Sequence, residues 1–204
     1  MLGRMPSDNE VRPGTLGHDY GDVLWQPGPE VVERARITAY QRWLATERGI
    51  ALGGGSVPVG YRDLHQWSVT EPGAFWDSLW DYFDVAGERG DGPVLTGTTM
   101  PDVTWFPGAT LNYAQNALRT AATDPARIAV IARDEAGNQS TLSYGELAAE
   151  VARVRAGLIA LGVTTGDRVA AYLPNIPAAI IGLLATASIG AIWSSCSPDF
   201  GRPA

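Results

Sequence analysis

The pattern of hydrophobic and polar residues divides the chain into three regions. Residues 1–20 are polar and interrupted by Pro and Gly, which predicts a flexible arm. Residues 21–122 contain aromatic-rich helical stretches between Pro- and Gly-rich loops, which predicts a helical N-terminal region. Residues 123–204 alternate short apolar runs with amphipathic stretches, a pattern typical of the start of an α/β domain.

The middle region contains three helix predictions. Pro29 suits a first helical turn and Gly49 a stop, so one helix is expected between them. A second helix is expected after an N-cap at or near Thr70, with Pro72 in its first turn, and a third near Thr110. The first helix has an apolar stripe formed by Val32, Ala35, Ala39 and Trp43. Tyr40 and Leu44 widen this stripe.

The third region begins with a predicted β-hairpin. Its strands are Ile128–Arg133 and Gln139–Leu142, joined by the turn 135–138. Ser143 and Glu146 then have the spacing of a capping box, which starts a helix. Apolar residues at alternating spacings of four and three mark its buried face, and Gly162 ends it; they are Leu147, Val151, Val154, Leu158 and Leu161.

The run from Val169 to Pro198 contains no charged residue and allows two interpretations. Its length would span a bilayer. However, breakers near Pro177 and at Gly190 divide it into a strand, a helix over 178–189 and a strand over 191–195. This division favours one right-handed βαβ unit, whose parallel strands are apolar throughout because both faces are covered. Such strands need further sheet neighbours, so the chain is expected to be the opening part of a larger protein.

Composition narrows the function. The net charge of −7, with no cluster of Arg, argues against binding to nucleic acid and against binding to anionic lipid surfaces. All fifteen basic residues are Arg, so a Walker-type phosphate loop and a Schiff-base lysine are both excluded from this sequence. The single cysteine cannot form an internal disulfide, and no apolar leader is present, so a cytoplasmic protein is expected.

Several residues could suggest chemistry but have simpler interpretations. Ser194, Ser195 and Ser197 lack the G-x-S-x-G context of a nucleophile, and Cys196, without a basic neighbour, is expected to be a buried, inert thiol. His18 is expected to be solvated and His65 to lie in a loop or to pack, and the two have no metal-ligand spacing. The Gly53–Ser56 stretch suits a linker. One aromatic set is expected in the core; it comprises Trp76, Trp80, Phe83, Trp105 and Phe106.

Three stretches of the chain resemble a known family. "EPGAFWDSLWDYF", "TWFPGATLNYAQNAL" and the sequence from Leu142 to Gly201 are similar to the adenylate-forming acyl-CoA synthetases. The segments "WFPGATLNYA" and "WSSCSPDFG" resemble, more narrowly, the acetoacetate–CoA ligases. Acetyl-CoA synthetases share similar "WF…G…LN" and "Y-x-E-L" segments. The resemblance extends over about residues 24 to 201.

The resemblance implies a fold and a reaction. Residues 123–204 would be the first hairpin and βαβ units of an incomplete AMP-binding domain. The whole enzyme would use ATP, CoA and Mg²⁺ to convert acetoacetate, through an acyl-adenylate, to acetoacetyl-CoA, AMP and pyrophosphate. The family's Lys-ending phosphate loop and its C-terminal catalytic Lys are not in this sequence, so no catalytic residue is assigned.

The resemblance also implies one candidate site. The loop after the last strand would lie near the CoA nucleotide, consistent with ligand binding at the carboxyl ends of strands in open α/β sheets. Its residues are Ser197, Pro198, Asp199, Phe200 and Gly201. The alternatives are a ligase for acetate or another short acid, and a stand-alone, non-catalytic module that binds a partner polypeptide or a nucleotide. For a ligase, the expected partners are a small acid and the C-terminal part of the same enzyme.

Overall fold

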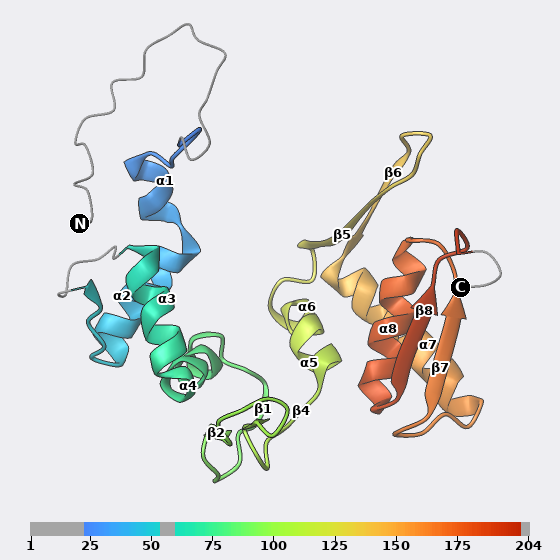
Figure 1. Ribbon diagram of the computed structural model, residues 1–204. Coiled ribbons are helices and arrows are strands. Elements are labelled where there is room, and N and C mark those ends of the chain that lie inside the picture. Colours follow the sequence, from blue (N-terminus) through green and yellow to red (C-terminus); the bar gives the residue numbers. More distant parts are fainter. Residues whose placement is uncertain (1–22, 54–59, 201–204) are drawn as a thin grey trace, which may run out of the picture. The chain divides into compact units, whose positions relative to one another are not determined.

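A computed structural model describes residues 23–53 and 60–200 of the chain, which form two units. The first unit ends at Thr70 and the second begins at Glu71. Figure 1 follows the chain through its helices and strands. The predicted flexible arm of residues 1–20 and most of the Gly53–Ser56 stretch lie outside the described residues.

The first unit consists of helices α1 (Pro29–Arg34), α2 (Arg36–Glu47) and α3 (Tyr61–Thr70). The prediction of one helix from Pro29 to Gly49 is wrong, because Ala35 adopts an extended conformation, with φ −65° and ψ 139°. The Thr38 hydroxyl donates to the Val32 carbonyl at 2.7 Å across this break and satisfies a group at the end of α1.

The buried face of α2 also differs from the predicted stripe. Ala39 is exposed and Trp43 only partly buried, whereas Leu44 is fully buried and Tyr40 nearly so. Two polar residues, Thr38 and Gln41, complete this face. The two residues predicted to widen the stripe, Tyr40 and Leu44, are thus the buried ones, and the buried face is rotated towards them.

The second unit begins with α4 (Pro72–Tyr82), whose N-cap is Glu71. The predicted cap at or near Thr70 is confirmed to within one residue, since Thr70 itself ends α3 and its hydroxyl donates to the Gln66 carbonyl at 2.9 Å. Four two-residue strands follow in two antiparallel pairs, after which the chain enters two short helices. The strands are β1 (Gly87–Glu88) with β4 (Thr110–Leu111) and β2 (Leu95–Thr96) with β3 (Thr104–Trp105), and the helices are α5 (Tyr113–Leu118) and α6 (Thr120–Thr123).

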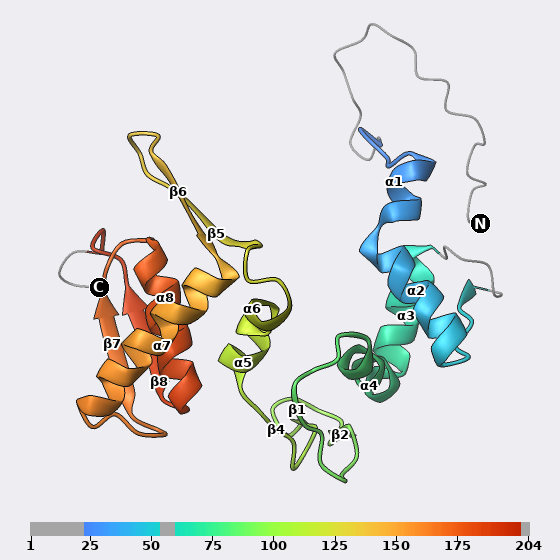
Figure 2. The same cartoon turned by 180° about the vertical axis from the view of Figure 1, so that it is seen from behind.

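The predicted hairpin and the long helix after it are confirmed. Strand β5 (Ile128–Arg133) pairs antiparallel with β6 (Gln139–Ser143), and α7 spans Tyr144–Ala160 (Figure 2). Both hydrogen bonds of the capping box are present: the Ser143 hydroxyl accepts from the Glu146 amide, and the Glu146 carboxylate accepts from the Ser143 amide at 2.8 Å. The sequence rule for a helix start therefore holds here in full.

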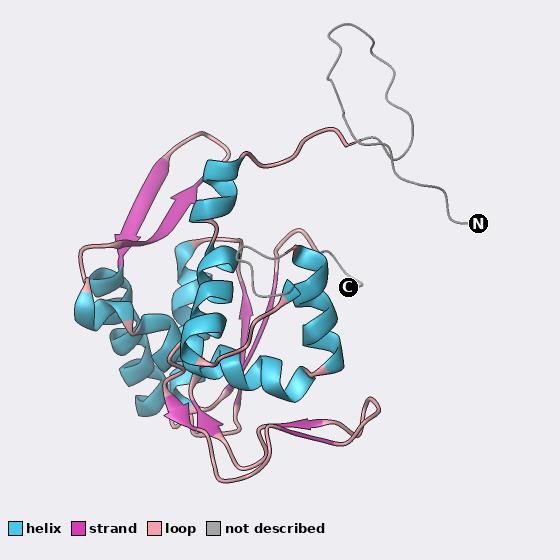
Figure 3. Cartoon of the chain, turned by 90° about the vertical axis from the view of Figure 1, so that its left-hand side faces the viewer, coloured by secondary structure: helices cyan, strands magenta, loops and turns pink. Residues whose placement is uncertain are grey.

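The uncharged run forms strand, helix and strand. Strand β7 (Arg168–Tyr172) runs parallel to β8 (Ile192–Cys196), and α8 (Pro177–Ile189) connects them (Figure 1), whereas Figure 3 colours the helices and strands of the whole chain by type. Gly190 ends α8 in the left-handed conformation, with φ 79°. This confirms the predicted β–α–β order, and no helix of the described residues has the length and apolar character that a bilayer span requires.

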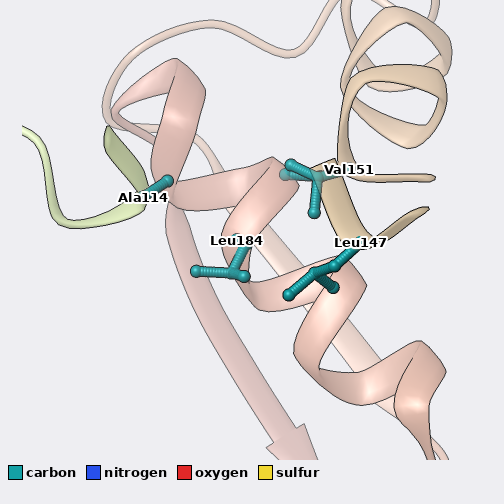
Figure 4. Close-up of a cluster of buried hydrophobic side chains, with 5 residues drawn as sticks. Ala114, Leu147, Val151 and Leu184 are labelled. Atoms are coloured by element: carbon teal, nitrogen blue, oxygen red, sulfur yellow. The ribbon is translucent and has the colours of Figure 1, made fainter. Parts of the chain in front are cut away.

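The core of the second unit lies between α5, α7 and α8. Its buried side chains come from all three helices, and Figure 4 labels four of them; the set is Ala114, Leu147, Val151, Leu184 and Ala185. The predicted apolar face of α7 thus supplies two core residues. Leu161, predicted to extend that face, is 83% exposed instead, because α7 ends one residue before it.

Helix α8 lies closely against one face of the two-stranded sheet. A Cβ atom on Gly182 would come within 2.6 Å of the Trp193 ring, so any other residue at this position would require the ring or the helix to shift. Along β7 and β8 the partly buried residues are Val169, Ala171 and Trp193, whereas Tyr172 and Ile192 are exposed. The opposite face of the sheet is therefore open to solvent in the part of the chain that the structure describes.

Candidate functional site

The candidate loop begins at the carboxyl end of β8. The parallel register pairs Tyr172, the last residue of β7, with Cys196, the last residue of β8. Because side chains of paired residues project to the same face of a sheet, Tyr172 and Cys196 are neighbours on its open face. The Leu173 amide donates to the Cys196 carbonyl at 3.2 Å and extends the pairing by one bond. Ser197 to Phe200 follow directly at this edge.

Hydrogen bonds inside the loop form a compact turn. The Ser197 hydroxyl donates to the Asp199 carboxylate at 2.8 Å and accepts from the Asp199 amide at 3.3 Å. The Phe200 amide donates to the Ser197 carbonyl at 3.1 Å. A bond from outside the loop reaches it as well, because the Tyr172 hydroxyl donates to the Pro198 carbonyl at 3.1 Å.

The loop presents hydrogen-bonding groups and one aromatic ring to solvent. Pro198, Asp199 and Phe200 are exposed, the last of them by 62%. Asp199 is the only charged residue of the loop, and a carboxylate accepts hydrogen bonds from hydroxyl or amino groups but repels phosphate. Such a loop can bind a ribose or a base, and it offers no nucleophile–base pair. The fifth predicted residue, Gly201, lies outside the described residues.

The prediction that Cys196 is buried is wrong, because its side chain is exposed. Strand β8 pairs only with β7 among the described residues, so its last residues lie at the open edge and face of a two-stranded sheet. Ser194 and Ser195 are exposed for the same reason.

His65 belongs to no cluster of metal-binding side chains among the described residues. His65 lies on α3 rather than in a loop, is exposed, and its ring lies 6.0 Å from that of Tyr61. His18 is outside the described residues. Within residues 23–53 and 60–200, no three His, Cys, Asp or Glu side chains are close enough together to hold a metal ion.

The predicted aromatic core exists in part. The ring of Trp80 lies 4.9 Å from that of Phe106, and Trp76 lies 5.7 Å from Trp105 in an edge-on arrangement. However, Trp76, Trp105 and Phe83 are between 43% and 53% exposed. The rings therefore pack in pairs on a partly solvated surface, with Arg89 above Trp80 at 5.6 Å, rather than in a closed core.

Two asparagines in the "TLNYAQN" stretch have structural roles that the sequence analysis did not identify. Asn112 caps α5, accepting from the Ala114 amide at 2.9 Å, and its amide group donates to the Ala187 carbonyl of α8 at 2.8 Å. Asn116 exchanges two 2.9 Å hydrogen bonds with the backbone of Ala86. An Asn directly before a helical stretch is an N-cap signal, which could have located Asn112.

A cleft of about 240 Å³ lies between the tip of the hairpin and the start of α8. Its lining includes Arg133, Asn138 and Asn175. None of the described residues 197–200 lines it, so the cleft and this part of the loop are separate features.

Two family models match consecutive parts of the chain. Residues 61–117 match the N-terminus of acetyl-coenzyme A synthetase, and residues 118–204 match the AMP-binding enzymes. Together they account for the region from the start of α3 to the loop after β8. The α/β elements of the second unit from residue 118 onward therefore lie in the part that matches the AMP-binding enzymes, whereas the preceding part of that unit lies in the other match.

Individual relatives agree with these matches. The acetoacetyl-coenzyme A synthetase of Rhizobium meliloti is 43% identical over 179 residues, which are 88% of this chain and 26% of the relative. The malonamoyl-CoA synthetase of Penicillium aethiopicum is 42% identical, over 96% of this chain and 28% of its own length. A solved structure, the acetoacetyl-CoA synthetase from Streptomyces lividans, superposes with a TM-score of 0.79 at 46% identity, over 87% of this chain and 27% of that one. The chain therefore spans about a quarter of the length of these relatives.

Proposed function

We propose that this chain, which is homologous to the N-terminal quarter of acetoacetyl-CoA synthetases, forms the corresponding part of an acetoacetate–CoA ligase. The whole enzyme would join acetoacetate to AMP and release pyrophosphate from ATP. The CoA thiolate would then displace AMP and give acetoacetyl-CoA. A small carboxylic acid is the substrate in this proposal, and the remaining part of the same enzyme is the chain's main partner.

The observation that carries the proposal is the agreement of sequence and fold with one enzyme. The match at 46% identity and a TM-score of 0.79 extends over 87% of the chain. Acetoacetyl-CoA synthetases from Rhizobium meliloti, Rattus norvegicus and Gallus gallus are 38–43% identical over 88% of it. Agreement of this extent favours the acetoacetate branch over a more distant acyl-CoA synthetase.

The chain contributes no catalytic side chain to this reaction in the proposal. It has no Lys, so the Lys residues that the family resemblance implies would come from the rest of the enzyme. We assign residues 197–201 to contact with the nucleotide part of CoA. The exposed Asp199 carboxylate can accept hydrogen bonds from ribose hydroxyls or a base amino group, and the exposed Phe200 ring can stack on a base.

Enzymes of the AMP-binding family use ATP and CoA. The described residues do not fit a Mg²⁺ site, because they contain no cluster of acidic side chains that could hold one. Any Mg²⁺ that assists adenylation is therefore assigned to the whole enzyme. A cytoplasmic location completes the proposal, supported by the unpaired Cys196 and the net charge of −7.

The test uses the full-length product of the gene and the 204-residue chain side by side. The full-length product should catalyse ATP–pyrophosphate exchange that depends on acetoacetate, and should form acetoacetyl-CoA when CoA is added. The chain alone should catalyse no exchange. Exchange by the chain alone would show that it contains the catalytic groups, and a full-length product inactive with every short acid would refute the ligase assignment.

A ligase for a different short acid is the second candidate. The relative named malonamoyl-CoA synthetase is 42% identical over 96% of the chain, as similar as several acetoacetyl-CoA synthetases. Comparing kcat/KM for acetoacetate, malonamate and acetate in the exchange assay separates these possibilities. A preference for acetoacetate of less than about tenfold over malonamate, or about 1.4 kcal/mol, would leave the acetoacetate assignment unsupported.

A further inference from the structure

The hydroxyl of Tyr172 makes the hydrogen bond that ties the candidate loop to the neighbouring strand. It donates to the Pro198 carbonyl at 3.1 Å, between residues 26 positions apart in sequence. We propose that Tyr172 is a positioning residue that holds the loop Ser197–Phe200 in the conformation in which it binds the nucleotide part of CoA. This inference rests on the proposed function of the loop.

The geometry of the sheet places Tyr172 for this role. Tyr172 and Cys196 are paired at the ends of the parallel strands, so the Tyr172 ring lies on the open sheet face beside the residue that precedes the loop. The ring is 63% exposed in the part of the chain that the structure describes, so no described residue covers it. From this position the hydroxyl reaches two residues beyond the end of β8.

The other hydrogen bonds of the loop cannot replace this one. The bonds that involve Ser197, Asp199 and Phe200 join loop residues to each other. The bond from the Leu173 amide reaches Cys196, the last residue of the strand, and not the loop itself. Judged by the described hydrogen bonds, the loop without the Tyr172 hydroxyl would keep its internal turn. The turn as a whole would then be free to move relative to the strand ends.

Such freedom would weaken ligand binding because the loop would no longer be preorganised for the ligand. A loop held in its binding conformation loses less conformational entropy when the ligand arrives, so its release raises the dissociation constant without changing any direct contact. One net hydrogen bond of about 0.5–1.5 kcal/mol corresponds to about a two- to tenfold change, and solvent exposure of Tyr172 favours the lower half of this range. The change should be confined to the CoA step, because adenylation precedes the arrival of CoA.

The test compares the Tyr172→Phe variant with wild type in the full-length enzyme. Tyr172→Phe removes one oxygen at an exposed position, and Tyr113→Phe is the matched control, because Tyr113 is 62% exposed and lies away from the loop at the start of α5. Tyr172→Phe should raise KM for CoA by about two- to fivefold, while acetoacetate-dependent ATP–pyrophosphate exchange and the melting temperature stay unchanged. Tyr113→Phe should change none of these. An equal loss of exchange and thioester formation in Tyr172→Phe would overturn the inference, because a general structural role would affect both steps.

A second readout separates this inference from the proposed function of the loop. Cys196 is exposed and directly precedes the loop, so its alkylation rate, located by mass spectrometry of Arg-cleaved peptides, reports on local order. Without ligand, the rate should rise about two- to fivefold in Tyr172→Phe. In wild type, 3′,5′-ADP should protect Cys196, since this nucleotide represents the CoA end without its thiol. If Cys196 is alkylated faster in Tyr172→Phe but 3′,5′-ADP does not protect it in wild type, Tyr172 holds the loop in place but the loop is not a nucleotide site. If the alkylation rate is the same in Tyr172→Phe and wild type, Tyr172 does not hold the loop, whatever the effect of the nucleotide.

Discussion

Two parts of the second unit are stabilised in different ways. The packed body, defined as α7, β7, α8 and β8 (residues 144–196), contains regular elements around buried apolar side chains, with Leu147 and Leu184 at its centre. The tied segment, residues 83–111, has only two-residue strands, and polar side chains hold its backbone. Asn116 bonds to Ala86 in both directions, and Arg119 donates to the Asp84 carbonyl at 2.6 Å.

A third polar anchor lies at Arg89 in the tied segment. Its guanidinium contacts the carboxylates of Asp77 and Asp81 on α4, at 2.9 and 2.7 Å, and lies above the Trp80 ring. Periodic apolar residues thus specify the packed body, whereas single polar residues specify the tied segment. Substitutions in the core of the packed body should lower the global free energy of unfolding, whereas substitutions at the polar anchors of the tied segment should cause local unfolding.

The largest expected effect comes from breaking the packed body at Leu147. Leu147→Ala removes a side chain that is 4% exposed and leaves a cavity against Leu184 and Val151. We expect the free energy of unfolding to fall by about 2–4 kcal/mol, measured by urea unfolding followed by circular dichroism.

Leu161→Ala is the matched control for this substitution, because the same atoms are removed from a residue that is 83% exposed. Its free energy of unfolding should stay within about 0.5 kcal/mol of wild type. Equal effects of the two substitutions would mean that the core is not centred on Leu147.

A smaller, local effect is expected from breaking the tied segment at Asn116. Asn116→Asp keeps the shape of the side chain and the acceptor for the Ala86 amide, but it removes the donor to the Ala86 carbonyl and places a carboxylate against it. We expect a loss of about 1–2 kcal/mol, seen first as faster amide hydrogen exchange in β1 and β4.

Gln115→Ala is the control for Asn116, because Gln115 is the adjacent, exposed residue of the same helix. It should leave exchange in β1 and β4 unchanged. If Asn116→Asp instead accelerated exchange equally throughout α7 and α8, the tied segment and the packed body would unfold as one, and the distinction between them would fail.

The sequence predicted the packed body well because its signals are periodic and local. The capping box at Ser143, the apolar spacing from Leu147 and the break at Gly190 each follow from rules that act within one or two helical turns. The same rules failed where tertiary contacts decide. Ala35 interrupts a helix that its neighbours favour, and the helix predicted near Thr110 is present but starts at Tyr113, because Thr110–Leu111 pairs with Gly87–Glu88.

The loop after β8 was predicted in position but not in its surroundings, and its role as a site stays a prediction. The loop after β8 does lie at the carboxyl ends of two parallel strands, as the strand–helix–strand pattern required. The exposure of Cys196 and the bond from Tyr172 to Pro198 could not be predicted, because both depend on which strand is the neighbour of β8 and on which face is covered. A single sequence contains no register information of that kind.

The smallest expected effect concerns the start of α7 and its dependence on pH. The backbone amide of Ser143 donates to the Glu146 carboxylate, and this bond lowers the pKa of Glu146 below its ordinary value of 4.5. A carboxyl group with a lowered pKa in the folded state stabilises that state fully above its unfolded pKa, and the contribution is lost as pH falls through the lower, folded value. The capping box should therefore weaken only below about pH 4.5.

Glu146→Gln tests this directly, because glutamine can still accept the bond from Ser143 but does not titrate. Thermal unfolding at pH 6, 4.5 and 3 should show wild type more stable than the variant at pH 6, with the difference shrinking or vanishing at pH 3. A difference that stays constant over this range would mean that Glu146 stabilises α7 by packing and not by its charge. Glu146→Gln should not change the stability of the tied segment. Amide hydrogen exchange in β1 and β4, measured at the same three pH values, should therefore be the same in the variant and in wild type. Such a result would show that the start of α7 stabilises only the packed body.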